Sequence, residues 1–101
     1  RENKFTTTGL TPVKSDLVDA PYVEEFPMIL ECKVIHTQEI GLHTQFIGEI
    51  VDVKVDQSAL TEDGLPDMVK VAPFIYGGEI QAYHRVGEKI GTAFNIGKSK
   101  R

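Results

Sequence analysis

The chain has 101 residues, which is enough for one small domain, and its hydrophobic (41%) and charged (26%) fractions are ordinary for a soluble globular protein. The formal net charge of −4 argues against a nucleic-acid partner, because nucleic-acid-binding proteins usually carry a basic patch or stripe. No apolar run approaches the roughly 18 residues that a membrane helix needs, so no membrane partner is expected.

Cys32 is the single cysteine of the chain, so no internal disulfide is expected. This cysteine usage fits a reducing compartment, and we expect a cytoplasmic protein. The first residue is Arg1 rather than a methionine, so we expect that a further segment precedes it.

Residues 1–27 predict a loop-rich lead-in with short helical segments. Within it, the segment DAPYVEEFP (19–27) predicts one helical turn. Asp19 is a suitable cap, Pro21 suits an early helical position, and Pro27 ends a helix.

From Met28 the apolar residues alternate with a period of two, and residues 28–56 predict one long β-hairpin with a bend at 39–42. The end of its second strand is expected to face valines inward and charged residues outward: Val51, Val53 and Val55 against Asp52, Lys54 and Asp56. The start of that strand is apolar on both faces, so we expect a second sheet, a partner subunit or a ligand to cover it.

Gly48 interrupts this two-sided part of the strand. It predicts a β-bulge or strand bend, or a backbone that lies close to a flat ligand or another strand.

Residues 57–101 predict short strands and a tail. The strands are expected over about 71–76, where Pro73 indicates an edge strand or strand end, and 80–86. The fold class is therefore mostly β. Four such strands do not close a barrel comfortably, so we expect part of a barrel whose remaining strands lie upstream or in a partner.

Polar and aromatic residues suggest where a ligand could bind. His43 opens a strand at a bend, either as an exposed loop histidine or as a donor to a ligand carbonyl or phosphate at the mouth of a barrel. A late cluster could stack on and hydrogen-bond a nucleotide-like ligand, or simply pack on a strand face: Tyr76, Tyr83, His84 and Arg85. The histidines and Cys32 lack metal-ligand spacing, so no metal site is expected.

Two blocks carry a resemblance to a known family: LECKVIHTQEIGLHTQFIGEIVDVKVD (30–56) and PFIYGGEIQAYHRVGEKIGTAFNIGK (73–98). They resemble the C-terminal half of the flavoredoxin group, within the flavin reductase-like family of FMN-binding split barrels. The opening RENKFTTTGLTPVKSDLVDAPYVEEFPMILECK resembles the segment that this group carries before its long hairpin. The resemblance covers nearly the whole chain.

The resemblance implies that residues 1–101 are the C-terminal part of one Greek-key split β-barrel domain. It implies a homodimer with FMN near the subunit interface, and transfer of electrons from NAD(P)H or an electron-transfer partner. Many relatives have Gly-Asp-His where this chain has Gly41-Leu42-His43, in a turn linked to nicotinamide binding. The chain therefore departs from the family at Leu42 and retains His43.

The resemblance also suggests roles for individual residues. His43 is the catalytic candidate, and the expected cofactor-binding residues are Arg1, Lys4, Phe46, Tyr83 and Arg85. Phe46 and Tyr83 would pack near the flavin ring, while His43 and Arg85 would offer polar contacts. The alternative is a non-catalytic half-barrel that acts as a dimerisation or assembly segment, since an unpaired sheet edge and a small core both favour a partner.

Overall fold

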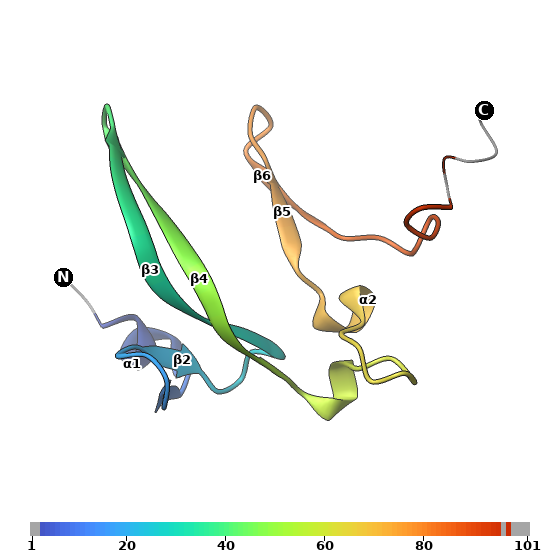
Figure 1. Cartoon of the computed structure of the whole chain (residues 1–101), viewed down its shortest axis with the longest axis horizontal. Helices are drawn as coiled ribbons and strands as arrows, with labels where there is room; N and C mark the ends of the chain where they lie inside the picture. The colour runs from blue at the N-terminus through green and yellow to red at the C-terminus, as the bar shows by residue number, and fades with distance from the viewer. Residues whose placement is uncertain (1–2, 96, 98–101) are drawn as a thin grey trace.

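The computed structural model describes residues 3–95 and 97, and most of the backbone in regular elements is extended (Figure 1). In this part of the chain, six strands pair in chain order as three separate antiparallel sheets, β1–β2, β3–β4 and β5–β6. The prediction of a mostly β chain with a short helical segment before the main hairpin is confirmed.

The helical segment of the lead-in is α1 (Lys4–Thr8). The side chain of Asn3 caps its start by accepting a hydrogen bond from the Phe5 N–H at 3.0 Å. The helix ends at Gly9, whose φ of +76° lies in the left-handed region that glycine adopts without a steric penalty.

The helical turn predicted over residues 19–27 is wrong. β2 (Pro21–Val23) lies there and pairs with β1 (Pro12–Lys14). In the loop between them, the buried Ser15 accepts hydrogen bonds at its Oγ from two backbone N–H groups of the loop. Strand pairing prevails because a single helical turn is unstable without tertiary support.

The long hairpin is confirmed as β3 (Met28–Ile40) and β4 (His43–Val55). The connecting turn contains Gly41, whose φ is +56°. The pairing register shifts twice along the hairpin, between residues 31 and 32 and between residues 34 and 36. We call residues 28–32 and 51–55 the base of this hairpin, and residues 33–50 its outer arm.

Gly48 lies beside the second of these register shifts, opposite Val34. A Cβ atom at Gly48 would lie only 3.1 Å from the Cβ of Cys32. The predicted β-bulge is therefore confirmed, and the close approach seen here is to the paired strand of the same hairpin, so an approach to a flat ligand or covering strand stays a prediction.

The predicted orientation of the valines in the base is wrong at Val51 and Val53, which are 39% and 45% exposed. On the charged face Glu31, which pairs with Asp52, is only 3% exposed. The reason is that Tyr22 of β2 lies against this charged face, with its ring 5.6 Å from the Lys54 ammonium.

The last part of the described chain contains a 3-10 helix, η1 (Gln57–Ala59), a short helix, α2 (Met68–Val71), and a hairpin of β5 (Phe74–Gly77) and β6 (Ala82–Arg85). The two predicted short strands are confirmed with shorter bounds. The first begins three residues later than expected, because α2 occupies the chain as far as Val71.

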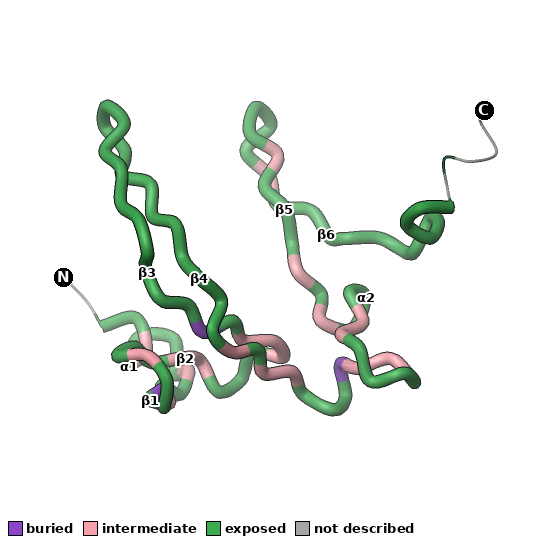
Figure 2. The backbone as a smooth tube through the Cα atoms, viewed as in Figure 1, coloured by how far each residue is buried: buried purple, intermediate pink, exposed green. Residues whose placement is uncertain are grey.

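The chain is open rather than compact. Its radius of gyration is 17.4 Å, against about 13 Å for a compact domain of this length. The described residues that are buried lie at separate places along the tube in Figure 2: Ser15, Glu31 and Ala59. Among the residues that the structure describes, none covers the start of β4, where apolar side chains lie on both faces, since Phe46 is 64% exposed. No helix of the described part is long and apolar enough to cross a bilayer.

Candidate functional site

Two of the predicted site residues lie on the outer arm of the long hairpin. His43 is the first residue of β4 and pairs with Ile40 beside the turn. Phe46 pairs with Thr37, and both candidate side chains are exposed. The hairpin thus presents an imidazole and a phenyl ring at its free end, where Leu42 is also fully exposed.

Two further candidates lie on β6, in the second hairpin. Tyr83 pairs with Tyr76 of β5, and Arg85 pairs with Phe74. Alternate residues of a strand share a face, so three rings and a guanidinium lie on one face of this hairpin. The ring of Tyr83 lies 5.1 Å from that of Phe74 and 5.4 Å from that of Tyr76, between centroids.

Lys4 is exposed on α1, at the opposite end of the molecule from the two hairpin turns (Figure 1). Arg1 lies outside the described residues. The hairpins β3–β4 and β5–β6 form two separate arms whose turns project in the same direction. Within one chain, the described candidates therefore occupy three places, and only Tyr83 and Arg85 share a surface.

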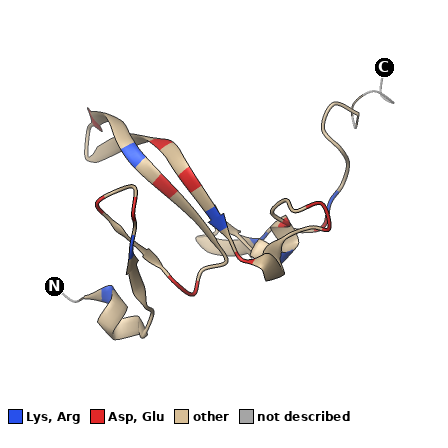
Figure 3. Ribbon diagram, turned by 60° about the horizontal axis from the view of Figure 1, so that its bottom comes forward, with Lys and Arg blue, Asp and Glu red and all other residues tan. Residues whose placement is uncertain are grey.

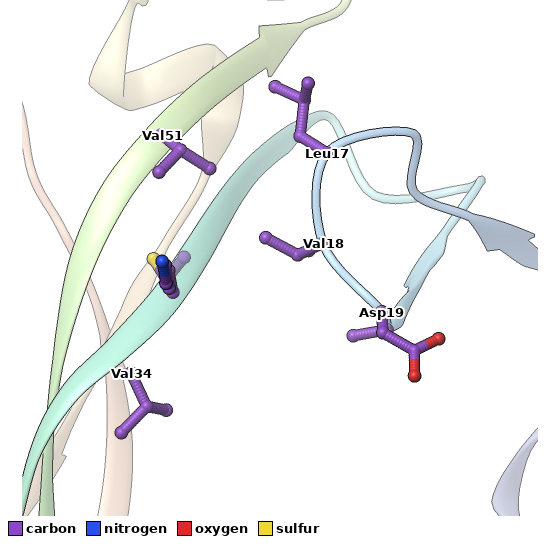
Figure 4. Close-up of a pocket in the computed structure, with 8 residues that line it drawn as sticks. Leu17, Val18, Asp19, Val34 and Val51 are labelled. Carbon is purple, nitrogen blue, oxygen red and sulfur yellow. The ribbon is translucent and has the colours of Figure 1, made fainter.

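A groove that the sequence did not predict lies between the loop of residues 15–20 and the long hairpin (Figure 4). Its volume is about 780 Å³, within the range of small-molecule sites. Leu17 and Val18 point toward the hairpin, whereas the carboxylate of Asp19 points away. The other lining residues are Ala20, Cys32, Lys33, Val34 and Val51.

No sequence signal marked this groove. Leu17 and Val18 form an isolated apolar pair, and they lie well before the hairpin in the chain. Only the pairing of β1 with β2 brings them to Val34. The groove therefore depends on a tertiary contact that periodicity does not reveal.

A charged cluster holds the base of the long hairpin. Lys54 Nζ donates to Asp52 Oδ2 at 2.6 Å and to Glu31 Oε2 at 3.0 Å. These hydrogen bonds raise the pKa of Lys54, and the bond from Lys54 lowers the pKa of Asp52. Glu31 Oε1 is buried without a hydrogen-bond partner, so Lys54 is the cation that offsets the buried charge of Glu31.

Charges of both signs are interspersed along the long hairpin (Figure 3). No group of three or more histidine, cysteine or acidic side chains in the described part of the chain could hold a metal ion.

Comparison with known proteins places this arrangement in a family. The model of the flavin reductase like domain matches residues 1–84. The flavoredoxin of Desulfovibrio vulgaris (Miyazaki F) is 56% identical, with a TM-score of 0.88 over 97% of this chain and 52% of its own.

Two other solved structures agree. A flavoredoxin from Methanosarcina acetivorans is 31% identical, with a TM-score of 0.79 over 90% of this chain and 48% of its own. A protein with a split barrel domain from Shewanella frigidimarina is 34% identical, with a TM-score of 0.68 over 90% of this chain and 46% of its own.

The chain spans about half the length of each of these relatives. The predicted fold, part of a split β-barrel, is confirmed by their likeness. With most of its length matched by the family's model, the chain belongs to the flavin reductase like domain family.

Proposed function

We propose that this chain is part of an FMN-binding, flavoredoxin-like protein that transfers electrons between a reduced donor and an acceptor. The observation that supports this most strongly is the 56% identity with a flavoredoxin over 97% of the chain. FMN would supply the redox chemistry, since flavins accept and release electrons in one or two steps. The protein would bind and orient the flavin and exclude competing reactions.

Exposed side chains at the two hairpins would hold the flavin. Phe46 and Tyr83 are 64% and 71% exposed, which leaves both rings free for contact with the isoalloxazine. His43 and Arg85 would donate hydrogen bonds to its polar edge or phosphate, and the ammonium of Lys4 would attract the phosphate. Arg1 stays a prediction for the same role.

The electron donor would be NAD(P)H or an electron-transfer partner. Leu42 stands beside His43 at the turn and exposes its whole side chain. An apolar residue at that turn cannot accept the hydrogen bonds that an aspartate would, which favours a partner that is not a nicotinamide nucleotide. The Leu42→Asp variant tests this, because it should increase the rate of flavin reduction by NADH or NADPH if the turn contacts the nucleotide.

The active form would be a homodimer in the cytoplasm. The accessible surface is 9120 Å², about 3,400 Å² more than a folded monomer of this mass exposes. Obligate interfaces bury about 2,000–5,000 Å² in total, which is about 1,000–2,500 Å² on each copy, so a second copy would cover a large part of this excess. The free thiol of Cys32 is compatible with a reducing compartment.

Visible absorption of the purified chain, alone and during titration with FMN, tests the flavin proposal. We expect a stoichiometric flavin signal that co-elutes with a dimer in size-exclusion chromatography with light scattering. His43→Ala should weaken binding or slow reduction, whereas His36→Ala, an exposed histidine on the same hairpin, should not. A dimer that retains flavin neither as this chain nor when extended to the length of its relatives would overturn the proposal.

That last result would favour the second candidate function, a half-barrel that acts as an assembly segment. The observation in its favour is the open shape, with a radius of gyration of 17.4 Å. Bound flavin discriminates between the two functions, because an assembly segment has no need of it.

A further inference from the structure

A second, smaller cavity lies between the β1–β2 hairpin and the base of the long hairpin, and we call it the Glu31 cavity. Its volume is about 240 Å³, and it shares Val18, Ala20 and Cys32 with the larger groove described above. The long hairpin contributes Glu31 to its lining, and the β1–β2 hairpin contributes Tyr22. The cavity is smaller than most ligand pockets, so it suits a ligand of only a few heavy atoms.

The carboxylate of Glu31 has an unsatisfied acceptor at this cavity. Its side chain is only 2% exposed, and its Oε2 accepts a hydrogen bond from Lys54 Nζ at 3.0 Å. Its Oε1 is also buried, and no described residue donates to it. A buried carboxylate oxygen without a donor costs free energy, because it has lost its hydrogen bonds with water. A donor that enters the cavity would offset this cost.

The charges around Glu31 favour a cation as that donor. Lys54 is shared between Glu31 and Asp52, so the cluster holds two carboxylates and one ammonium. Lys14 of the β1–β2 hairpin pairs with Asp19 instead. One negative charge of the cluster therefore has no counter-ion among the described residues. Since solvent screens a buried carboxylate poorly, its attraction for a cation is strong.

The walls of the Glu31 cavity suit an apolar chain attached to such a cation. Val18, Ile29 and Leu30 contribute apolar side chains to the lining, and Val18 points toward the long hairpin (Figure 4). Tyr22 adds an aromatic ring, which already lies 5.6 Å from the Lys54 ammonium, and such rings attract cations. A short alkyl chain that ends in an ammonium matches both the walls and the carboxylate.

We propose that the Glu31 cavity binds a small primary amine in its ammonium form, with the ammonium donating to Glu31 Oε1 and the alkyl chain against the apolar walls. Because Oε1 is covered, entry needs a local opening of the β1–β2 hairpin. Each strand of that hairpin has three residues, and an isolated two-stranded hairpin is only marginally stable, so it can open locally. The site uses none of the residues proposed to hold the flavin.

The test is a titration of the full chain with n-propylammonium chloride, with uncharged n-propanol and with sodium chloride as controls. Cys32 is the single thiol of the chain, is exposed and lines the cavity. Its rate of reaction with the neutral reagent methyl methanethiosulfonate therefore reports occupancy. We expect n-propylammonium to slow this reaction several-fold in a saturable way and to shift the amide NMR signals of residues 28–32. The two controls should do neither.

Two variants separate the charge of the cavity from its space. Glu31→Gln keeps the size of the side chain and removes its charge, so it should weaken n-propylammonium binding about tenfold or more. Glu49→Gln, at an exposed carboxylate of the same hairpin, should leave binding unchanged. Val18→Phe keeps Glu31 and fills the cavity with a larger side chain, so it should also weaken binding. It decides the matter if circular dichroism shows that Glu31→Gln does not fold.

Three outcomes would overturn the inference. Equal binding of n-propanol and n-propylammonium would show that the cavity selects apolar chains and not a cation. Unchanged n-propylammonium binding in Glu31→Gln and Val18→Phe would place the amine elsewhere on the chain. A titration without any saturable response would mean that water alone satisfies Glu31 Oε1. None of these results bears on flavin binding, so the proposed function stands or fails separately.

Discussion

The base and the outer arm of the long hairpin are built from the same two strands, yet they differ in what surrounds them. In the base, the β1–β2 hairpin lies against the sheet, and Lys54 joins Glu31 and Asp52. In the outer arm, apolar side chains such as Phe46 and Ile50 are exposed. The base is thus supported on its charged face by contacts within the chain, whereas the described residues of the arm are exposed on both faces.

This difference indicates where stability and association arise. A buried carboxylate needs its cation in the same chain, so changes in the base should act on folding. Exposed apolar side chains gain burial only from a partner, so changes in the arm should act on assembly. The predictions below test that division, beginning with the largest expected effect on stability.

Replacing Lys54 with methionine should cause the largest loss of stability. It leaves the nearly buried Glu31 directly opposite Asp52, two carboxylates without their shared cation. Hydrogen exchange of the amides in residues 28–32 and 51–55 should accelerate, and urea unfolding should begin at lower concentration. Lys33→Met, at an exposed lysine of the same hairpin, is the control. Equal effects of the two variants would contradict the importance of the cluster.

The same cluster predicts a pH dependence. The pKa of Asp52 is lowered from 3.8, mainly by the hydrogen bond from Lys54, so its contribution to stability is present above 3.8 and is lost as the pH falls through the lowered pKa. The pKa of Lys54 is raised from 10.5, mainly by Asp52, so its contribution is present below 10.5 and is lost as the pH rises through the raised pKa.

Stability of the base should therefore be highest between pH 3.8 and 10.5. Urea unfolding within this range and at pH values below 3.8 and above 10.5 measures the difference, and Asp52→Asn should reduce the loss of stability at acid pH. Some acid dependence should remain in that variant, because hydrogen bonds from the Thr11 N–H and hydroxyl lower the pKa of Glu25. An unchanged acid side in Asp52→Asn would show that Asp52 does not contribute.

Gly48→Ala should cost about 1–3 kcal/mol of unfolding free energy, because the new methyl would meet the Cβ of Cys32 at 3.1 Å. The Cys32→Gly change in the same chain should restore part of this loss by removing the opposing atom. Gly87→Ala is the control, since nothing lies within 4 Å of its position. If Gly48→Ala proves neutral, the strands separate easily at the bulge.

These regions also show what sequence alone can predict. The long hairpin follows from the period of two after Met28. The β-bulge at Gly48 follows from a glycine placed where apolar side chains occupy both faces of the strand. The pairing of β1 with β2 was missed, because those strands are only three residues long and carry no period. Without that pairing, the burial of Glu31 and the exposure of Val53 could not be predicted.

The candidate site was predictable to a similar extent. Tyr83 and Arg85 lie on one face because alternate strand residues do so, which local sequence reveals. The contact of Tyr83 with Phe74 depends on the register of β5 with β6, which the sequence did not specify. His43 lies on the other hairpin, and the placement of one hairpin relative to the other is a tertiary feature that no local pattern encodes.

Asp67→Ala should cost about 1 kcal/mol, since the side chain of Asp67 caps α2 by accepting hydrogen bonds from two backbone N–H groups. Asp67→Asn keeps an acceptor oxygen and should change stability by much less. Chemical shifts of residues 68–71 report the helix, and the base of the long hairpin should be unaffected. A loss of order in the base would show that the two regions fold as one unit.

Ile50→Thr should have the smallest effect on the stability of the single chain, within about 0.5 kcal/mol, because Ile50 is 55% exposed there. Its effect on association should be larger, since a second copy that covers the outer arm would bury this side chain. Sedimentation velocity at several protein concentrations measures both species, and the unfolding midpoint at low concentration measures the monomer. Glu49→Gln, at the neighbouring exposed residue, is the control. If Ile50→Thr destabilises the monomer and leaves association unchanged, the outer arm is held by its own chain, and the contrast with the base disappears.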